Sequence, residues 1–448
     1  MAAIWFQQAL IGRDWQQRVR VRVENGLIEA VEAGVDPAPG DERHAVGIPG
    51  LPNLHSHAFQ RAMAGLTEYR ASRTDDFWSW REIMYRFANA ITPEQLETVA
   101  AFAFVEMLEA GFTRVGEFHY VHHRPDAQPF ADPAEMSVRI AAAAAETGIA
   151  LTLLPVFYAH GGFGGAAPGA QQRRFFNTLD GFADLLEGAE RAVAGLPDAV
   201  LGVAPHSLRA VTPDELRAVA AMRPDDPVHI HIAEQQREVD DCLAWSGQRP
   251  VEWLFEEMAP DARWCLVHAT HVTDAEIARL AASGAAAGLC PITEANLGDG
   301  IFPAARFLEA RGRFGIGSDS NVRIDVAEEL RLLEYGQRLT ERKRCVLAGE
   351  HEPSVGRNLV LGALEGGGRA LGAPAAIAAG APADIVALKP RIGGAIGPDI
   401  LDQWVFTANV AVDSVWRRGV KMVSDGRHRT RDAAERRYAA ALAELRAA

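Results

Sequence analysis

Two closely spaced histidine pairs occur in or just after short apolar segments. His55 and His57 lie two residues apart, so on an extended strand both imidazoles point to the same side and can reach one ion. By itself such a pair is more often a surface or hydrogen-bonded pair, but its place at the end of an apolar strand favours a metal site. His229 and His231 repeat the spacing, which alone does not say which of them is the ligand.

Three further residues follow apolar segments and could join the same chemistry. Glu234 comes just after the strand with the second pair, where a carboxylate could move protons, yet it is equally typical of a solvated residue that opens a helix. His268 ends an apolar run, and taken alone it would more often be a core histidine. Asp319 follows a glycine-containing run and could either ligate a metal or cap the next helix.

The elements that must position these residues alternate between short apolar runs and helix-length amphipathic segments such as 93–110 and 274–283. The candidate strands are 46–54, 113–119, 150–157, 200–206, 227–233, 263–268, 285–290 and 313–318. Strands separated by helices in this way favour a (β/α)8 TIM-type barrel over an open doubly wound sheet. The chain has no GxGxxG or Walker motif to support a nucleotide-binding fold. In such a barrel the chemistry lies at the carboxyl ends of the strands.

Both ends of the chain have the pattern of short strands. Val19, Val21 and Val23 alternate with arginines, and Asn25-Gly26 then supplies a turn. Residues 405–412 and 414–423 also favour strands, with a turn at Arg418-Gly419. We therefore predict a small β-sandwich domain built from 1–47 and 366–448, the latter with a terminal helix, around a barrel of 48–365.

Size and charge limit the class of protein. A chain of 448 residues with 48% hydrophobic content can bury a large core. The net charge of -14 argues against binding to nucleic acid or to an anionic membrane. The four cysteines are scattered, which suits a reducing cytoplasm, and we find neither a signal peptide nor a membrane-spanning run.

Taken together, the histidine pairs, the strand-six histidine and the strand-eight aspartate resemble the amidohydrolase superfamily in type and order. Members with two metals often bridge them with a lysine on strand four, but the only lysines here lie outside the first seven predicted strands, at Lys343, Lys389 and Lys421. The segment His231–Glu234 instead matches the His-x-x-Glu signature of the single-metal deaminases.

This resemblance implies one divalent metal, with zinc favoured by the imidazole and carboxylate donors. The ligands would be His55, His57, His231 and Asp319. Asp319 would accept a proton from the attacking water, Glu234 would pass a proton to the leaving nitrogen, and His268 would orient the water. A non-catalytic binding protein on the same barrel would be expected to have lost part of this set.

A closer resemblance, to the N-formimino-L-glutamate deiminases, rests on the segments 51–65, 116–120 and 205–209. The positions that match substrate contacts in that family are Gln60, Tyr120, His206 and Arg209. Arg209 could bind a carboxylate through two parallel hydrogen bonds. No partner for a second carboxylate can be assigned; the arginines near the first loop have the pattern of solvated surface charges, and they are Arg61, Arg70, Arg73 and Arg81.

The expected reaction is hydrolysis of N-formimino-L-glutamate to N-formyl-L-glutamate and ammonia in histidine degradation, by a cytoplasmic homodimer. The alternative is deamination of a heterocyclic base or nucleoside of the guanine, cytosine or adenosine type. Arg209 separates the two, because an aromatic base has no carboxylate for it to bind.

Overall fold

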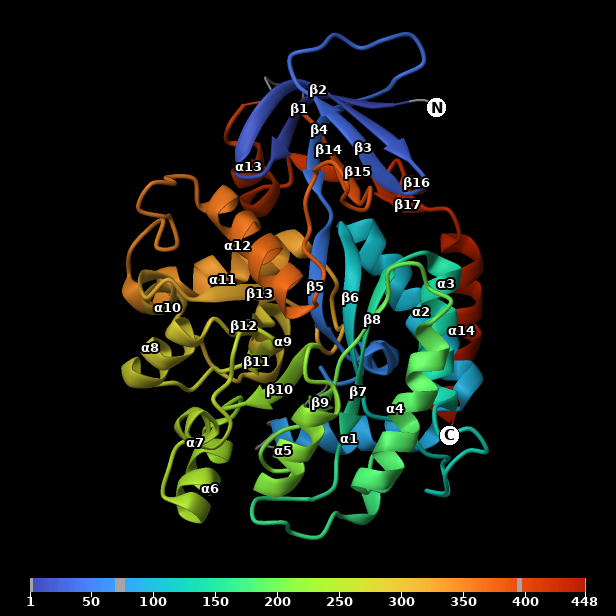
Figure 1. The fold of residues 1–448 in the computed structure, drawn as a ribbon, viewed down its shortest axis with the longest axis vertical. Helices are drawn as coiled ribbons and strands as arrows, with labels where there is room; N and C mark the ends of the chain where they lie inside the picture. The colour runs from blue at the N-terminus through green and yellow to red at the C-terminus, as the bar shows by residue number, and fades with distance from the viewer. Residues whose placement is uncertain (1–2, 69–76, 393–396, 448) are drawn as a thin grey trace.

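The computed structural model describes residues 3–68, 77–392 and 397–447. Two parts are evident: a barrel of parallel strands wrapped by helices, and a sheet at one end of it that combines both ends of the chain (Figure 1). Within the described residues, no helix has the length and apolar character that crossing a bilayer requires.

The barrel is formed by eight strand positions in chain order, with the fourth split in two. On one side of the barrel, parallel pairing follows the order β5-β6-β7-β8, and β9 also pairs with β7. On the other side it follows the order β10-β11-β12-β13. Parallel bridges close the ring at Val203–Val228 and at Ser56–Asp319. The strands are β5 (Leu51–Ser56), β6 (Phe112–His119), β7 (Ala150–Phe157), β8 (Val200–Leu201), β9 (Ala204–Pro205), β10 (Val228–Ile232), β11 (Trp264–His268), β12 (Ala286–Leu289) and β13 (Arg313–Ile316). The predicted fold class is confirmed.

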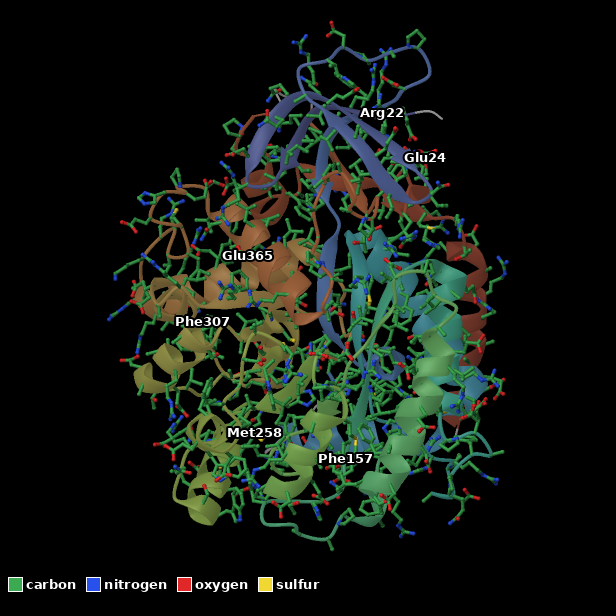
Figure 2. The ribbon with its side chains drawn as sticks, in the orientation of Figure 1. Arg22, Glu24, Phe157, Met258, Phe307 and Glu365 are labelled. Carbon is green, nitrogen blue, oxygen red and sulfur yellow. The ribbon has the colours of Figure 1, made fainter. Side chains whose placement is uncertain are left out.

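Helices follow the strands along the chain and cover the outside of the barrel, except α1, which lies at the end away from the terminal sheet (Figure 1). They are α1 (Phe77–Ala90), α2 (Pro93–Ala110), α3 (Glu135–Thr147), α4 (Leu179–Val193), α5 (Pro213–Met222), α6 (Gln236–Ser246), α7 (Pro250–Glu257), α8 (Asp274–Ser283), α9 (Pro291–Leu297), α10 (Ala304–Glu309), α11 (Val326–Glu341) and α12 (Val355–Ala370). The helices predicted at 93–110 and 274–283 have the expected bounds, and capping boxes at Thr92 and Thr273 explain where both begin. Large side chains fill the space between the layers: Phe157 at the end of β7 and Phe307 on α10 are fully buried (Figure 2).

The terminal sheet joins the two ends of the chain in the order β17-β16-β15-β14-β4-β1-β2-β3. Its strands are β1 (Ile4–Ile11), β2 (Asp14–Glu24), β3 (Leu27–Glu32), β4 (Glu42–Pro49), β14 (Ile385–Pro390), β15 (Val410–Arg417), β16 (Val420–Ser424) and β17 (Arg427–His428), with α13 (Ile400–Phe406) and α14 (Arg431–Ala447) beside them. On β2, Val19 and Val21 are buried while Arg22 and Glu24 are exposed, as the alternation predicts (Figure 2).

Two of the predicted strands are wrong in their bounds. The run 46–54 is broken at Gly50, so that β4 belongs to the terminal sheet and β5 to the barrel. A Cβ at Gly50 would lie 2.2 Å from the Thr113 side chain, so this crossing needs a glycine. The run 405–412 begins inside α13, because Leu401, Trp404 and Val405 form a buried stripe with helical spacing, and β15 starts only at Val410.

Candidate active site and metal centre

Three imidazoles meet where β5 and β10 end. His55 Nε2 lies 3.2 Å from His57 Nε2 and 3.1 Å from His231 Nε2, and all three side chains are buried. Tetrahedral zinc binds imidazole nitrogens at about 2.0–2.1 Å, which places two such nitrogens roughly 3.4 Å apart. The spacing of these nitrogens therefore fits a shared metal ion.

The Nδ1 atoms of His57 and His231 make hydrogen bonds that fix the tautomer of each ring. His57 Nδ1 lies 2.9 Å from the Phe118 carbonyl oxygen and His231 Nδ1 lies 3.1 Å from the His206 carbonyl oxygen. Since a carbonyl can only accept, each Nδ1 carries the hydrogen and each Nε2 presents a lone pair to the cluster. Burial lowers the pKa of His55 to about 4 and of His57 to about 3, so both rings are neutral, as metal ligands must be.

Asp319, three residues after the end of β13, lies against the histidine cluster. Its Oδ1 lies 3.3 Å from His57 Nε2 and 3.6 Å from His55 Nε2. The backbone fixes this position, because Asp319 N–H donates to the His55 carbonyl and His57 N–H donates to the Asp319 carbonyl. Asp319 also has a φ of 45°, an uncommon conformation that the two hydrogen bonds hold in place.

His229, which the spacing could not separate from His231, is directed to a structural contact. Its Nε2 donates to the Ala370 carbonyl oxygen at 2.8 Å. The three-histidine group able to hold an ion among the described residues is formed by His55, His57 and His231. The spacing alone left this choice open, and the structure places His231, the residue that the family resemblance implies, in the group.

His268 and Glu234 lie beside the cluster. His268 Nε2 is 3.7 Å from Glu234 Oε1 and 3.8 Å from Asp319 Oδ2, while its Nδ1 is 3.3 Å from Glu294 Oε1. Burial lowers the pKa of His268, but the surrounding carboxylates outweigh it and raise that pKa to about 10. Burial raises the pKa of Glu234 to about 6, against the opposing charges of His268 and Arg209. A carboxyl group with that pKa can exchange a proton near neutral pH.

The predicted substrate contacts line one cavity of about 50 Å³, whose wall also includes His57, His231, Glu234, His268 and Asp319. Gln60 Nε2 donates to Tyr120 Oη at 2.8 Å, and His206 Nδ1 lies 3.1 Å from Ser207 Oγ. Arg209 also reaches this cavity, and its Nε has no hydrogen-bond partner among the described residues. The structure therefore brings all the predicted contacts and ligands into one place.

Arg81 is a residue of the cavity wall that the sequence patterns missed. It was expected to be a solvated charge, but it lies on α1, lines the cavity and donates to Tyr158 Oη at 3.2 Å. Phe77 and Trp80 line the same cavity from α1, which sits at the end of the barrel away from the terminal sheet (Figure 1). An arginine on a helix carries no sequence signal that this helix covers the barrel mouth.

The remaining arginines of the first loop and one further carboxylate, Asp299, differ from Arg81 in their surroundings. Arg61 forms an ion pair with Glu106 at 2.6 Å, and Arg70 and Arg73 lie outside the described residues. Asp299 lies close to Glu234 and His268, with ligand atoms of all three within 4.8 Å of one another, and the sequence patterns did not single it out. Burial together with the charge of Glu234 raises the pKa of Asp299 to about 9.

Comparison with known protein families and sequences finds relatives over nearly the whole chain. The model described as "Amidohydrolase family" matches residues 46–422, and "Formimidoylglutamate deiminase HutF, N-terminal domain" matches residues 1–45. A formimidoylglutamate deiminase from Pseudomonas aeruginosa is 49% identical, covering 99% of this chain and 100% of its own. A 5-methylthioadenosine/S-adenosylhomocysteine deaminase from Natronomonas pharaonis is 30% identical, covering 81% of this chain and 77% of its own.

Solved structures agree with the fold. An amidohydrolase from Brucella melitensis has a TM-score of 0.97 and 56% identity, covering 99% of this chain and 100% of its own. An adenosine deaminase from Xanthomonas campestris, solved with bound zinc, has a TM-score of 0.80 at 23% identity, covering 100% of this chain and 99% of its own. The second of these supports the architecture alone.

Proposed function

Since this chain belongs to the amidohydrolase family and groups with the formimidoylglutamate deiminases, we propose that it hydrolyses N-formimino-L-glutamate to N-formyl-L-glutamate and ammonia in histidine degradation. Water adds to the formimino carbon and the bond from that carbon to the terminal nitrogen breaks. Both hydrogens of the water end on the departing nitrogen. The protein must therefore bind a dicarboxylate, position one water and carry protons over a short distance.

One divalent ion would be held by His55, His57, His231 and Asp319. Neutral imidazoles with fixed tautomers and a buried carboxylate support this ligand set, and among divalent ions they favour zinc. An ion bound there would supply a water whose pKa falls towards ~7.

Protons would move through the buried groups beside the ligands. Asp319 would accept the first proton from the water, because its carboxylate lies 3.3 Å from His57 Nε2 in the ligand cluster and 3.8 Å from His268, which would orient that water. Glu234 would deliver protons to the departing nitrogen, for which its pKa of about 6 is suited. His268 would orient the water and stabilise negative charge that develops on it, because the surrounding carboxylates favour its protonated form.

The substrate assignment rests on two arginines, Arg81 and Arg209, which line the same cavity as the candidate ligands His57, His231 and Asp319. N-formimino-L-glutamate has two carboxylates, and a guanidinium can bind each of them through paired hydrogen bonds. Arg81 thereby supplies a candidate for the second carboxylate. Gln60, Tyr120 and His206 would bind the rest of the substrate by hydrogen bonds.

An ammonia-release assay tests this assignment. The metal-loaded protein should release ammonia from N-formimino-L-glutamate, with N-formyl-L-glutamate as the other product, and should be inactive on guanine, cytosine and adenosine. The Arg209→Ala variant should lose most of this activity. A protein that acted on a heterocycle and was insensitive to the Arg209 change would contradict the proposal.

Location and assembly are further parts of the proposal. Four free thiols, at Cys242, Cys265, Cys290 and Cys345, support a cytoplasmic location. A homodimer is expected from the family resemblance, and sedimentation analysis of the purified protein would test it.

A further inference from the structure

Glu238 connects two groups to which the proposed function gives different tasks. It lies in the first turn of α6 and is 1% exposed. Its Oε2 accepts a hydrogen bond from the Glu234 backbone N–H at 3.3 Å and lies 3.8 Å from Arg209 Nη2. One carboxylate oxygen therefore contacts both the arginine proposed to bind a substrate carboxylate and the residue proposed to transfer protons.

The contact with Arg209 has a clear electrostatic purpose. The Arg209 side chain is only 13% exposed, and a buried guanidinium needs a counter-charge. Among the described residues, the ion pair recorded for Arg209 is the one with Glu238. Glu238 approaches one Nη, while the buried Nε has no partner among the described residues and Arg209 lines the cavity, so the guanidinium keeps donors that a ligand carboxylate could use.

A purely structural role for Glu238 has to be separated from this one. Acidic residues in the first turn of a helix stabilise it through the exposed N–H groups and the helix dipole. Glu276 is a matched example away from the cavity: it is 3% exposed in the first turn of α8 and its Oε2 lies 2.9 Å from Arg249 Nε. If Glu238 did no more than Glu276, its loss would lower stability without a specific effect on substrate binding.

We propose that Glu238 is a positioning residue that fixes the carboxylate-binding Arg209 and the proton-transferring Glu234 relative to each other. Glu238 does not touch the substrate; it acts through Arg209 on binding and through the Glu234 backbone on proton transfer. This inference rests on the proposed function, since both tasks come from it.

A double-mutant cycle on the metal-loaded protein tests the binding half. The four proteins are wild type, Arg209→Gln, Glu238→Gln and the double variant, each assayed for ammonia release from N-formimino-L-glutamate. Glu238→Gln should raise KM on the order of tenfold, within the range typical of coupled contacting residues. It should change kcat little, because the glutamine oxygen can still accept from Glu234 N–H. In the Arg209→Gln background the same change should have no further effect on KM.

The proton-transfer half is tested by comparing two substitutions of one residue. Glu238→Ala removes the acceptor for Glu234 N–H and should lower kcat on the order of tenfold, the usual cost of a lost hydrogen bond. Glu238→Gln keeps an acceptor for Glu234 N–H, so its kcat should be close to that of the wild type. The control Glu276→Gln should lower the melting temperature without changing KM or kcat.

The possible outcomes distinguish a failure of the proposed function from a failure of the proposed role of Glu238. A wild-type protein that releases no ammonia from N-formimino-L-glutamate would overturn the proposed function. An active wild type in which Glu238→Gln raises KM by the same factor in both backgrounds would overturn the positioning role alone. Melting temperatures establish that each variant is folded, and Glu238→Asp, which keeps the charge at a shorter reach, replaces Glu238→Gln in the cycle if the latter does not fold.

Discussion

Arg81 illustrates how much of a substrate site depends on single side chains. Its hydrogen bond to Tyr158 Oη holds the guanidinium at the cavity wall, and its charge lies close enough to contribute, after burial and Arg209, to lowering the pKa of His206. A neutral His206 can both donate and accept hydrogen bonds to a substrate. The two arginines and this histidine line the same cavity and supply it with polar groups suited to an acidic ligand.

We predict that Arg81→Gln raises KM for N-formimino-L-glutamate by about 10- to 150-fold, the factor that corresponds to one lost hydrogen bond to a charged group. Steady-state kinetics would measure it. The control is Arg124→Gln, which alters an exposed arginine paired with Asp126. An unchanged KM in the Arg81 variant would remove this residue from the substrate site.

His428 gives a prediction about pH that is independent of the metal centre. Burial lowers its pKa from 6.5 to about 4, and its Nε2 donates to the Thr147 carbonyl while Nδ1 accepts from Thr430 N–H. The folded protein therefore favours the neutral His428 ring. The folding stability that this ring contributes is present in full above pH 6.5 and is lost as the pH falls towards 4. The maximal slope from one such proton is about 1.4 kcal/mol per pH unit.

The His428→Gln variant should lack this slope. Chemical denaturation at several pH values would show a wild-type free energy of unfolding that falls more steeply than that of the variant in this window. Parallel profiles for the two proteins would contradict the assigned pKa.

The sequence could predict the candidate ligands because their signal is local. His55 and His57 reveal themselves by a two-residue spacing on a strand, and Asp319 by its place after a glycine-containing strand. The two-residue spacing alone does not separate His229 from His231; the His-x-x-Glu resemblance favours His231, and the contact that engages His229 is with the Ala370 carbonyl, which is far away in the chain.

At the scale of elements, close packing of α12 on the barrel depends on glycine. A Cβ on Gly366 would lie 1.9 Å from the Phe314 carbonyl oxygen of β13, and one on Gly367 would lie 2.6 Å from the Pro52 ring. These contacts let the helix approach the strands more closely than any side chain would permit. Glycine has a low intrinsic helix propensity, so these positions weaken the helix itself while they permit its close packing.

We predict that Gly366→Ala destabilises the protein by about 1–3 kcal/mol or more, since the clash is with backbone that cannot rotate away. Thermal or urea denaturation would measure the loss. Gly336→Ala, inside α11, is the matched control, because the added Cβ would make only an ordinary contact there, 3.4 Å from Ile301. Equal stability of the two variants would show that α12 can move away without cost.

Whole elements were predictable where capping and periodicity agree. Thr92 and Thr273 begin helices whose bounds the sequence predicts correctly. The single strand predicted over 46–54 is wrong, because a continuous apolar pattern does not show that the chain passes from one sheet to another at Gly50. Partners in a sheet are long-range, and the pattern of one strand does not contain them.

At the scale of the whole molecule, a buried ionic group ties the terminal sheet to the barrel. Arg417 on β15 contacts Asp198 at 2.9 Å, and Arg114 on β6 contacts the same carboxylate at 3.2 Å. Arg417 also pairs with Asp384, and its side chain is 4% exposed. Removing Asp198 would leave two buried guanidinium groups with less compensation.

We predict that Asp198→Ala lowers the free energy of unfolding by about 3–5 kcal/mol. Asp126→Ala, which breaks an exposed pair, should cost less than about 1 kcal/mol. Calorimetry of both variants would compare them. A small loss for Asp198→Ala would mean that the terminal sheet is held to the barrel by apolar packing instead.

The claim on which the chemistry depends is that one ion is shared by His55, His57, His231 and Asp319. The direct measurement is the metal content of the purified protein by elemental analysis, together with that of the His231→Ala variant. We expect one divalent ion per chain in the wild type and a large loss of metal in the variant. Two ions per wild-type chain, or a variant that retains its metal in full, would contradict the claim.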